Sequence, residues 1–231
     1  MLMLLPMVFA LATDPGPAAS SAPRPTPLTE IGRVRALPAC VPIVAHANGA
    51  ITQALDNDRT LAIISNNAHN TDFDRLNYLQ RRNAIEAMMK QAEAIRAASS
   101  SGDVEIKKLR EYAAAATDPE RKAELKAFAD ALGGALYRQK KAAVEFMRDV
   151  TIVQGREDAA EGKQIIANDS PVPPARPGTM LVTTSSIVPP PPQSYNKVFK
   201  LIGDDIDADV HGVQTDEGFA ADHSIAATSG C

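Results

Sequence analysis

Residues 117–153 read TDPERKAELKAFADALGGALYRQKKAAVEFMRDVTIV, and this stretch decides the fold. Thr117, Pro119 and Glu120 place a cap, a first-turn proline and an acid at one helix terminus, where the helix dipole favours negative charge. Apolar side chains then recur with a period near 3.6 through about residue 154: Leu125, Phe128, Leu132, Leu136, Ala143, Phe146 and Val150. We predict one helix of roughly 35 residues, about 50 Å long.

The pair Gly133-Gly134 interrupts this apolar stripe. Glycine weakens a helix interior by about 1 kcal/mol relative to alanine, so two in succession require a reason. We interpret the pair as a kink or as the place where a second helix crosses closely. A functional hinge is the alternative.

A first helix is predicted upstream, from Pro42 to about Ser65. Proline suits the first helical position because its missing N–H would have no partner there. Asn48-Gly49 weakens the middle of this helix. One face is apolar, with side chains three or four residues apart: Ile43, Ala47, Ile51, Leu55 and Ala62.

A second long helix and a short third helix are predicted between these two. Thr71 and Asp74 show the capping-box pattern that begins a helix. Residues 99–102, Ser-Ser-Ser-Gly, end it, because glycine permits a left-handed terminus. The short helix then covers residues 103–116.

Composition indicates where the core lies. Almost all 17 prolines fall outside residues 43–170, with Pro119 the exception. Aromatic residues make up 4% of the chain and Trp is absent, so Ala, Leu, Ile, Met and Val must build the core. Such residues suit close-packed helices better than a sheet. We therefore predict an all-α fold: an antiparallel helical bundle with coiled-coil-like packing, three long helices and one short, within residues 40–166.

The N-terminus has the features of an export signal. Residues 2–11 are largely apolar and end in Ala10-Leu11-Ala12, which predicts a signal peptide over residues 1–12 with cleavage after Ala12. No Lys or Arg precedes this apolar stretch, so the true start codon is not fixed by the sequence. The stretch is too short to cross a bilayer, which takes about 20 apolar residues. We expect a secreted or periplasmic protein without stable membrane insertion, and a Pro-rich, disordered spacer over residues 13–39.

The C-terminal segment, residues 167–231, carries eight acids and three bases. Its first part is Pro-rich, which is typical of a polyproline-type linker. Residues 180–188 favour a strand, with residues 198–202 as the one candidate partner. We predict that the whole segment is a disordered, acidic tail. The chain shows no basic face, which argues against a nucleic-acid partner.

The chain has two cysteines, Cys40 and Cys231. In an oxidising compartment an even number of cysteines favours a disulfide between them. Two independent thiols, or a bond to another molecule, are the alternatives.

No catalytic, cofactor-binding or metal-binding residues can be assigned from motifs. Asp205-x-Asp207-x-Asp209 resembles the start of a calcium loop, but the required Gly and Glu are missing in either register. We expect no enzyme and no cofactor.

The sequence favours a structural or protein-interaction module in the cell envelope or outside the cell, whose partner is an unknown protein or a second copy. The alternative is a small-ligand or metal-ion binding protein, calcium included, and such a site would need a cavity near 300 Å³.

Overall fold

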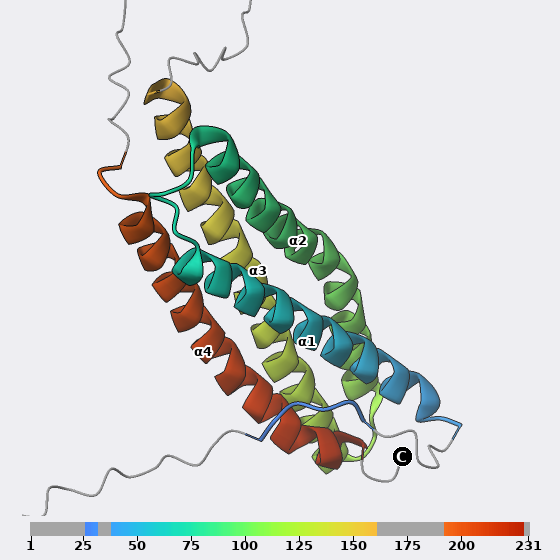
Figure 1. Cartoon of the computed structure of the whole chain (residues 1–231). Helices are drawn as coiled ribbons and strands as arrows, with labels where there is room; N and C mark the ends of the chain where they lie inside the picture. Colours follow the sequence, from blue (N-terminus) through green and yellow to red (C-terminus); the bar gives the residue numbers. More distant parts are fainter. Residues whose placement is uncertain (1–25, 32–37, 161–191, 229–231) are drawn as a thin grey trace, which may run out of the picture.

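Four long helices make up most of the protein in a computed structural model, which describes residues 26–31, 38–160 and 192–228 (Figure 1). They are α1 (Val41–Asn70), α2 (Tyr78–Ala115), α3 (Pro119–Ala160) and α4 (Tyr195–Thr228). The described residues contain no strand. The prediction of an all-α fold is confirmed, and the arrangement is consistent with a helical bundle.

The fourth helix corrects the prediction that residues 167–231 are a disordered tail. α4 lies within that segment and packs on the other helices, so the boundary of the fold at residue 166 is wrong. Its apolar side chains recur at helical spacing and are at most 7% exposed: Phe199, Ile202, Ile206, Val213, Ala220 and Ala221. Residues 198–202 are therefore helical, and no strand pairing is available to them. The Pro-rich residues 161–191 lie outside the described part.

α2 passes without a break through residues 99–102, which were predicted to separate a long helix from a short one. Gly102 is buried, and a Cβ on it would lie 3.1 Å from Leu136 Cδ1 of α3. Glycine serves here for a close helix approach rather than for a left-handed end. The described residues accordingly form four long helices, not three long helices and one short.

The connection between α1 and α2 also differs from the prediction. α1 continues five residues past Ser65, and Thr71 is its C-cap rather than the N-cap of the next helix. The capping box belongs to Asn77 and Gln80: the Asn77 side chain accepts from Gln80 N at 2.9 Å, and Gln80 Oε1 accepts from Asn77 N at 3.1 Å.

Asp74, predicted to begin α2, instead caps α4. Its Oδ1 accepts a hydrogen bond from Tyr195 N at 2.7 Å, and its Oδ2 accepts one from the Ser194 hydroxyl at 2.7 Å. These bonds lower the pKa of the Asp74 carboxyl, the Ser194 bond most strongly. A residue before α2 therefore satisfies the amides that open α4, more than a hundred positions later in the chain.

Part of the predicted N-terminal spacer also contacts the helices. Within residues 26–31, Leu28 is 6% exposed and belongs to the core. Asn48 of α1 binds the backbone of Ile31 twice: its Oδ1 accepts from Ile31 N at 2.7 Å, and its Nδ2 donates to Ile31 O at 3.0 Å. For these six residues the prediction of a disordered spacer is wrong. The rest of residues 1–37 lies outside the described part.

α1 and α3 are central, because each contacts every other helix, whereas α2 and α4 make no contact with one another in the described residues. Two apolar clusters fill the interior. One contains Ile51, Leu109 and Phe128, and the other contains Ile64, Phe146 and Phe199. Between them lies a buried polar layer with one residue from each helix, which we call the waist: Asn57, Ser99, Gln139 and Glu217.

Gly133 and Gly134 lie within α3, which continues through them without a break. A Cβ on Gly133 would lie 3.3 Å from Ile106 of α2, and a Cβ on Gly134 would lie 3.0 Å from Asp216 Oδ2 of α4. The two glycines therefore let α2 and α4 approach α3 from two sides. This agrees with the close helix crossing predicted from the sequence.

Candidate functional site

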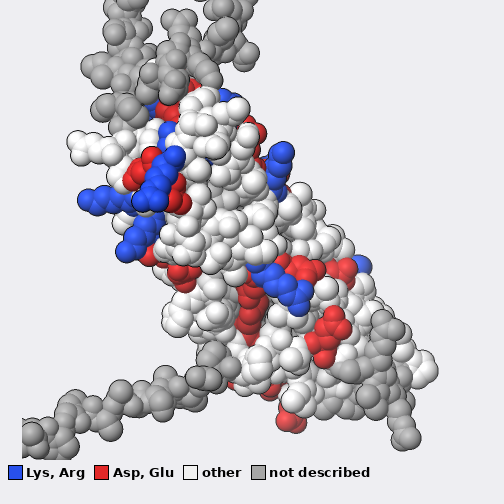
Figure 2. Space-filling view, viewed as in Figure 1, with Lys and Arg blue, Asp and Glu red and all other residues white. Residues whose placement is uncertain are grey.

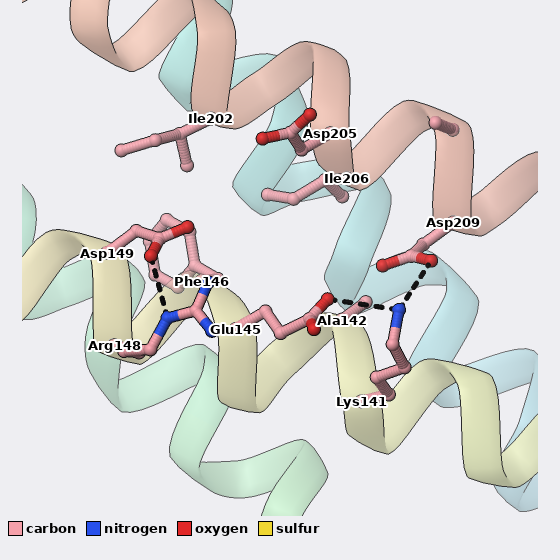
Figure 3. A pocket seen from close by; sticks show the side chains of 11 residues that line it. Lys141, Ala142, Glu145, Phe146, Arg148, Asp149, Ile202, Asp205, Ile206 and Asp209 are labelled. Atoms are coloured by element: carbon pink, nitrogen blue, oxygen red, sulfur yellow. Dashed lines mark hydrogen bonds and ion pairs between the residues drawn. The ribbon is translucent and has the colours of Figure 1, made fainter.

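A groove of about 280 Å³ between α3 and α4, which we call the α3/α4 groove, is the candidate site (Figure 3). Its floor is apolar and consists of two residues from each helix: Ala142 and Phe146, and Ile202 and Ile206. All four are 7% exposed or less. Each pair is spaced four residues apart, so a single face of each helix supplies it.

Charged side chains form the rim of the α3/α4 groove. They are Lys141, Glu145, Arg148 and Asp149 of α3, with Asp205 and Asp209 of α4. Acids exceed bases by four to two. A site with an apolar floor and a surplus of carboxylates suits an occupant that is apolar along its length and positively charged at one end.

Both bases of the rim are already paired within the protein (Figure 3). Lys141 Nζ lies 3.1 Å from Glu145 Oε2 and 3.5 Å from Asp209 Oδ1, and Arg148 Nε donates to Asp149 Oδ1 at 2.9 Å. These bonds raise the pKa of Lys141, Glu145 most strongly, and the pKa of Arg148, through Asp149.

Asp205 differs from the other acids of the rim. It is exposed and lines the groove, and no hydrogen bond or ion pair joins it to another residue of the described part. Its carboxylate is therefore the negative charge of the rim that remains available to an occupant. The sequence pointed to Asp205 only as part of a calcium pattern. The rim residues of α3 were not singled out, because the groove depends on α4, which was not predicted.

The three aspartates of the calcium pattern lie on a helix rather than in a loop. Asp205 and Asp209 face the groove, whereas Asp207 accepts from the Ser65 hydroxyl at 2.5 Å and lies 3.0 Å from His69 Nε2. Alternate positions on a helix do not share a face, so the three cannot converge on one ion. Among the residues that the structure describes, no three His, Cys, Asp or Glu side chains are grouped to hold a metal.

Cys40 is buried at the start of α1, and Arg121 Nη2 lies 3.3 Å from its sulfur. It lines a second cavity of about 260 Å³. The end of α4 lies at the same end of the fold, since Ala227 and Ile43 share one apolar cluster. Cys231 lies outside the described residues, and its bond to Cys40 stays a prediction.

Three of the four histidines bind a carboxylate on another helix. His46 lies 2.5 Å from Glu105, His69 lies 3.0 Å from Asp207, and His223 lies 2.6 Å from Glu124. The pairs join α1 to α2, α1 to α4 and α4 to α3. Each of these three histidines therefore has a role in helix packing, and none of them lines the α3/α4 groove.

Basic and acidic side chains are interspersed on the face shown in Figure 2, between wide areas of uncharged residues. Within the described residues, no helix combines the length and the apolar character that crossing a membrane requires.

Comparison of the chain with models of protein families, with curated proteins and with solved structures finds no match. The site must therefore be interpreted from its own geometry.

Proposed function

We propose that this chain is an exported, non-enzymatic antiparallel helical bundle that binds a basic segment of a partner protein in the α3/α4 groove. The observation that supports the proposal most strongly is the pairing in the rim. Both bases are neutralised by acids of the same protein, while the Asp205 carboxylate has no such partner in the described residues. A lysine or arginine of the partner would place its aliphatic stem over Phe146 and Ile206 and its charge at Asp205.

A small organic cation is the second candidate occupant. The volume of about 280 Å³ is close to the lower end of small-molecule sites, near 300 Å³. The groove is open along one side and bordered by charges rather than enclosed, which favours a protein segment over a small molecule. Both occupants share one chemistry, a cation next to an apolar surface, and binding experiments distinguish them.

A labelled peptide of alternating leucine and lysine should bind the full-length protein, and Asp205→Asn should weaken that binding about two- to fivefold. The expected loss is modest because the pair is exposed and screened by salt. Fluorescence anisotropy at low and at physiological ionic strength measures it. The control is Asp204→Asn, which removes an exposed charge at the adjacent position, 3.9 Å from His69 and outside the groove, and should leave the affinity unchanged.

Butylammonium, titrated in the same assay as a competitor, distinguishes the two occupants. Displacement of the peptide only at a large excess of butylammonium supports a protein segment. Tight binding of butylammonium with none of the peptide would favour the small cation. Equal weakening by the two aspartate variants would contradict the assignment of the groove.

The proposal of export rests on the apolar residues 2–11 and on Ala10-Leu11-Ala12. N-terminal sequencing of the protein from the periplasm or the medium should give a chain that begins at or near Thr13. Recovery of an intact chain beginning at Met1, from the cytoplasm alone, would contradict export.

A further inference from the structure

Two carboxyl groups meet at the waist, between the two apolar clusters. The carboxyl groups of Asp58 of α1 and Glu217 of α4 lie close enough to share a hydrogen bond. Glu217 is 7% exposed, and its Oε1 is buried without a partner. On the other side of Asp58, Gln139 Nε2 donates to Asp58 Oδ1 at 2.8 Å.

The amides around the pair favour the negative charge on Asp58 rather than on Glu217. Asn57 Nδ2 donates to Gln139 Oε1 at 3.0 Å, so the Gln139 amide is oriented with its nitrogen towards Asp58 and Ala54 O. Burial raises the pKa of Asp58, but the N–H that it receives from Gln139 opposes this rise and favours its ionised state. A carboxylate at Glu217 would place a second negative charge beside it, in a buried site and with an orphaned oxygen, which is strongly unfavourable.

We propose that Glu217 carries a proton and donates a hydrogen bond to the Asp58 carboxylate. The waist is then a proton-binding site that holds α4 against α1 and α3. A neutral carboxylic acid has one oxygen that donates and one carbonyl oxygen. The carbonyl oxygen tolerates burial without a partner far better than a charged oxygen does. Loss of the proton leaves two adjoining carboxylates on different helices, and their repulsion loosens the middle of α4.

The cations next to the waist do not compensate for this charge, because each has its own acid. On α3, Arg138 donates to Asp216 at 2.7 Å, and Lys140 lies 4.0 Å from Asp103 of α2. On α1, Arg59 donates to Asp56 at 2.8 Å. The further acid of α4 beside Glu217 is Asp216, which the bond to Arg138 occupies. α2 contributes the neutral Ser99 to the waist and makes no contact with α4.

The proposal predicts a specific pH dependence of folding. Burial, followed by the charge of Asp58, raises the pKa of Glu217 from its ordinary value of 4.5 to about 8. Between these values the folded chain retains a proton that the unfolded chain has lost, so stability falls as the pH rises. The unfolding equilibrium constant should increase about tenfold per pH unit through this window from the Glu217 proton alone, and that contribution should level off above about pH 8.

Denaturant unfolding of the full-length protein from pH 5 to pH 9 measures this slope. Glu217→Gln supplies a neutral donor to Asp58 and should reduce the slope by close to one proton, while Glu120→Gln, an exposed control on α3, should leave it unchanged. All other ionisable groups are the same in both proteins, so the difference between the two curves isolates the contribution of residue 217. Equal slopes in the wild type and Glu217→Gln would overturn the proposal.

An infrared titration of the wild type tests the site without any variant. At pH 6.5 exposed carboxyl groups are ionised, so one remaining carboxylic-acid C=O band, lost as the pH rises to 9, is the expected result. Hydrogen exchange should increase over residues 213–221 in the same range, after correction for the intrinsic rates, with α2 as the internal reference. A spectrum without a protonated carboxyl at pH 6.5, or exchange in α4 that follows α2 throughout, would overturn the proposal.

Discussion

Phe199→Ala should lower the free energy of unfolding by about 3–5 kcal/mol, a large part of the stability of a small domain. Phe199 is fully buried and stacks on Phe73, with ring centroids 4.0 Å apart and an interplanar angle of 18°. Removal of the ring leaves a cavity between α4 and the segment that follows α1. It also removes an aromatic contact worth about 0.5–1.5 kcal/mol beyond the buried area.

The same helix offers a matched control for this substitution. Phe219 is 58% exposed, and Phe219→Ala should change the free energy of unfolding by less than about 0.5 kcal/mol. Urea denaturation of the two variants at pH 6 measures both effects. Equal, small changes would mean that Phe199 is not part of the core and that α4 does not pack as described.

The helices that the sequence predicted best are those with large apolar residues at regular spacing. The stripe of α3 contains Leu125, Phe128, Leu132 and Phe146, and all four are buried. Helix ends and caps were predicted less well, because tertiary contacts override the local preferences of the residues. Gly102 resembles a helix terminus, yet the packing of Leu136 against it continues the helix. The partner of Asp74 is distant in sequence, so no local pattern identifies it.

α4 was missed because its acids dominate the composition of the C-terminal segment. Its apolar residues do follow helical spacing, but Glu217 interrupts the stripe, and small residues such as Gly203 and Ala220 occupy buried positions. A polar residue within an apolar stripe argues against burial unless a partner is known. Here the partner is Asp58 of α1, which no pattern in the sequence connects to it.

The candidate site depends on this helix, and so could not be predicted. Half of the floor of the α3/α4 groove and two acids of its rim belong to α4. A ligand site was expected to need a cavity near 300 Å³, and the groove is of about that size. The location of the cavity follows from the packing of α4 on α3.

The most direct test of the central claim, that α4 completes the fold and forms the site, is the thermal melt of a chain that ends at residue 193. The sequence alone predicted that residues 40–166 hold the whole fold. The structure predicts the opposite: without α4, buried faces of α1 and α3 are exposed, and Asp74 loses the helix terminus that it caps. Circular dichroism should show the shortened chain with reduced helicity and no cooperative transition, whereas the full-length chain melts in one step. Addition of a peptide of residues 192–228 should restore the transition. A cooperative melt of the shortened chain at the midpoint of the full-length protein would contradict the claim.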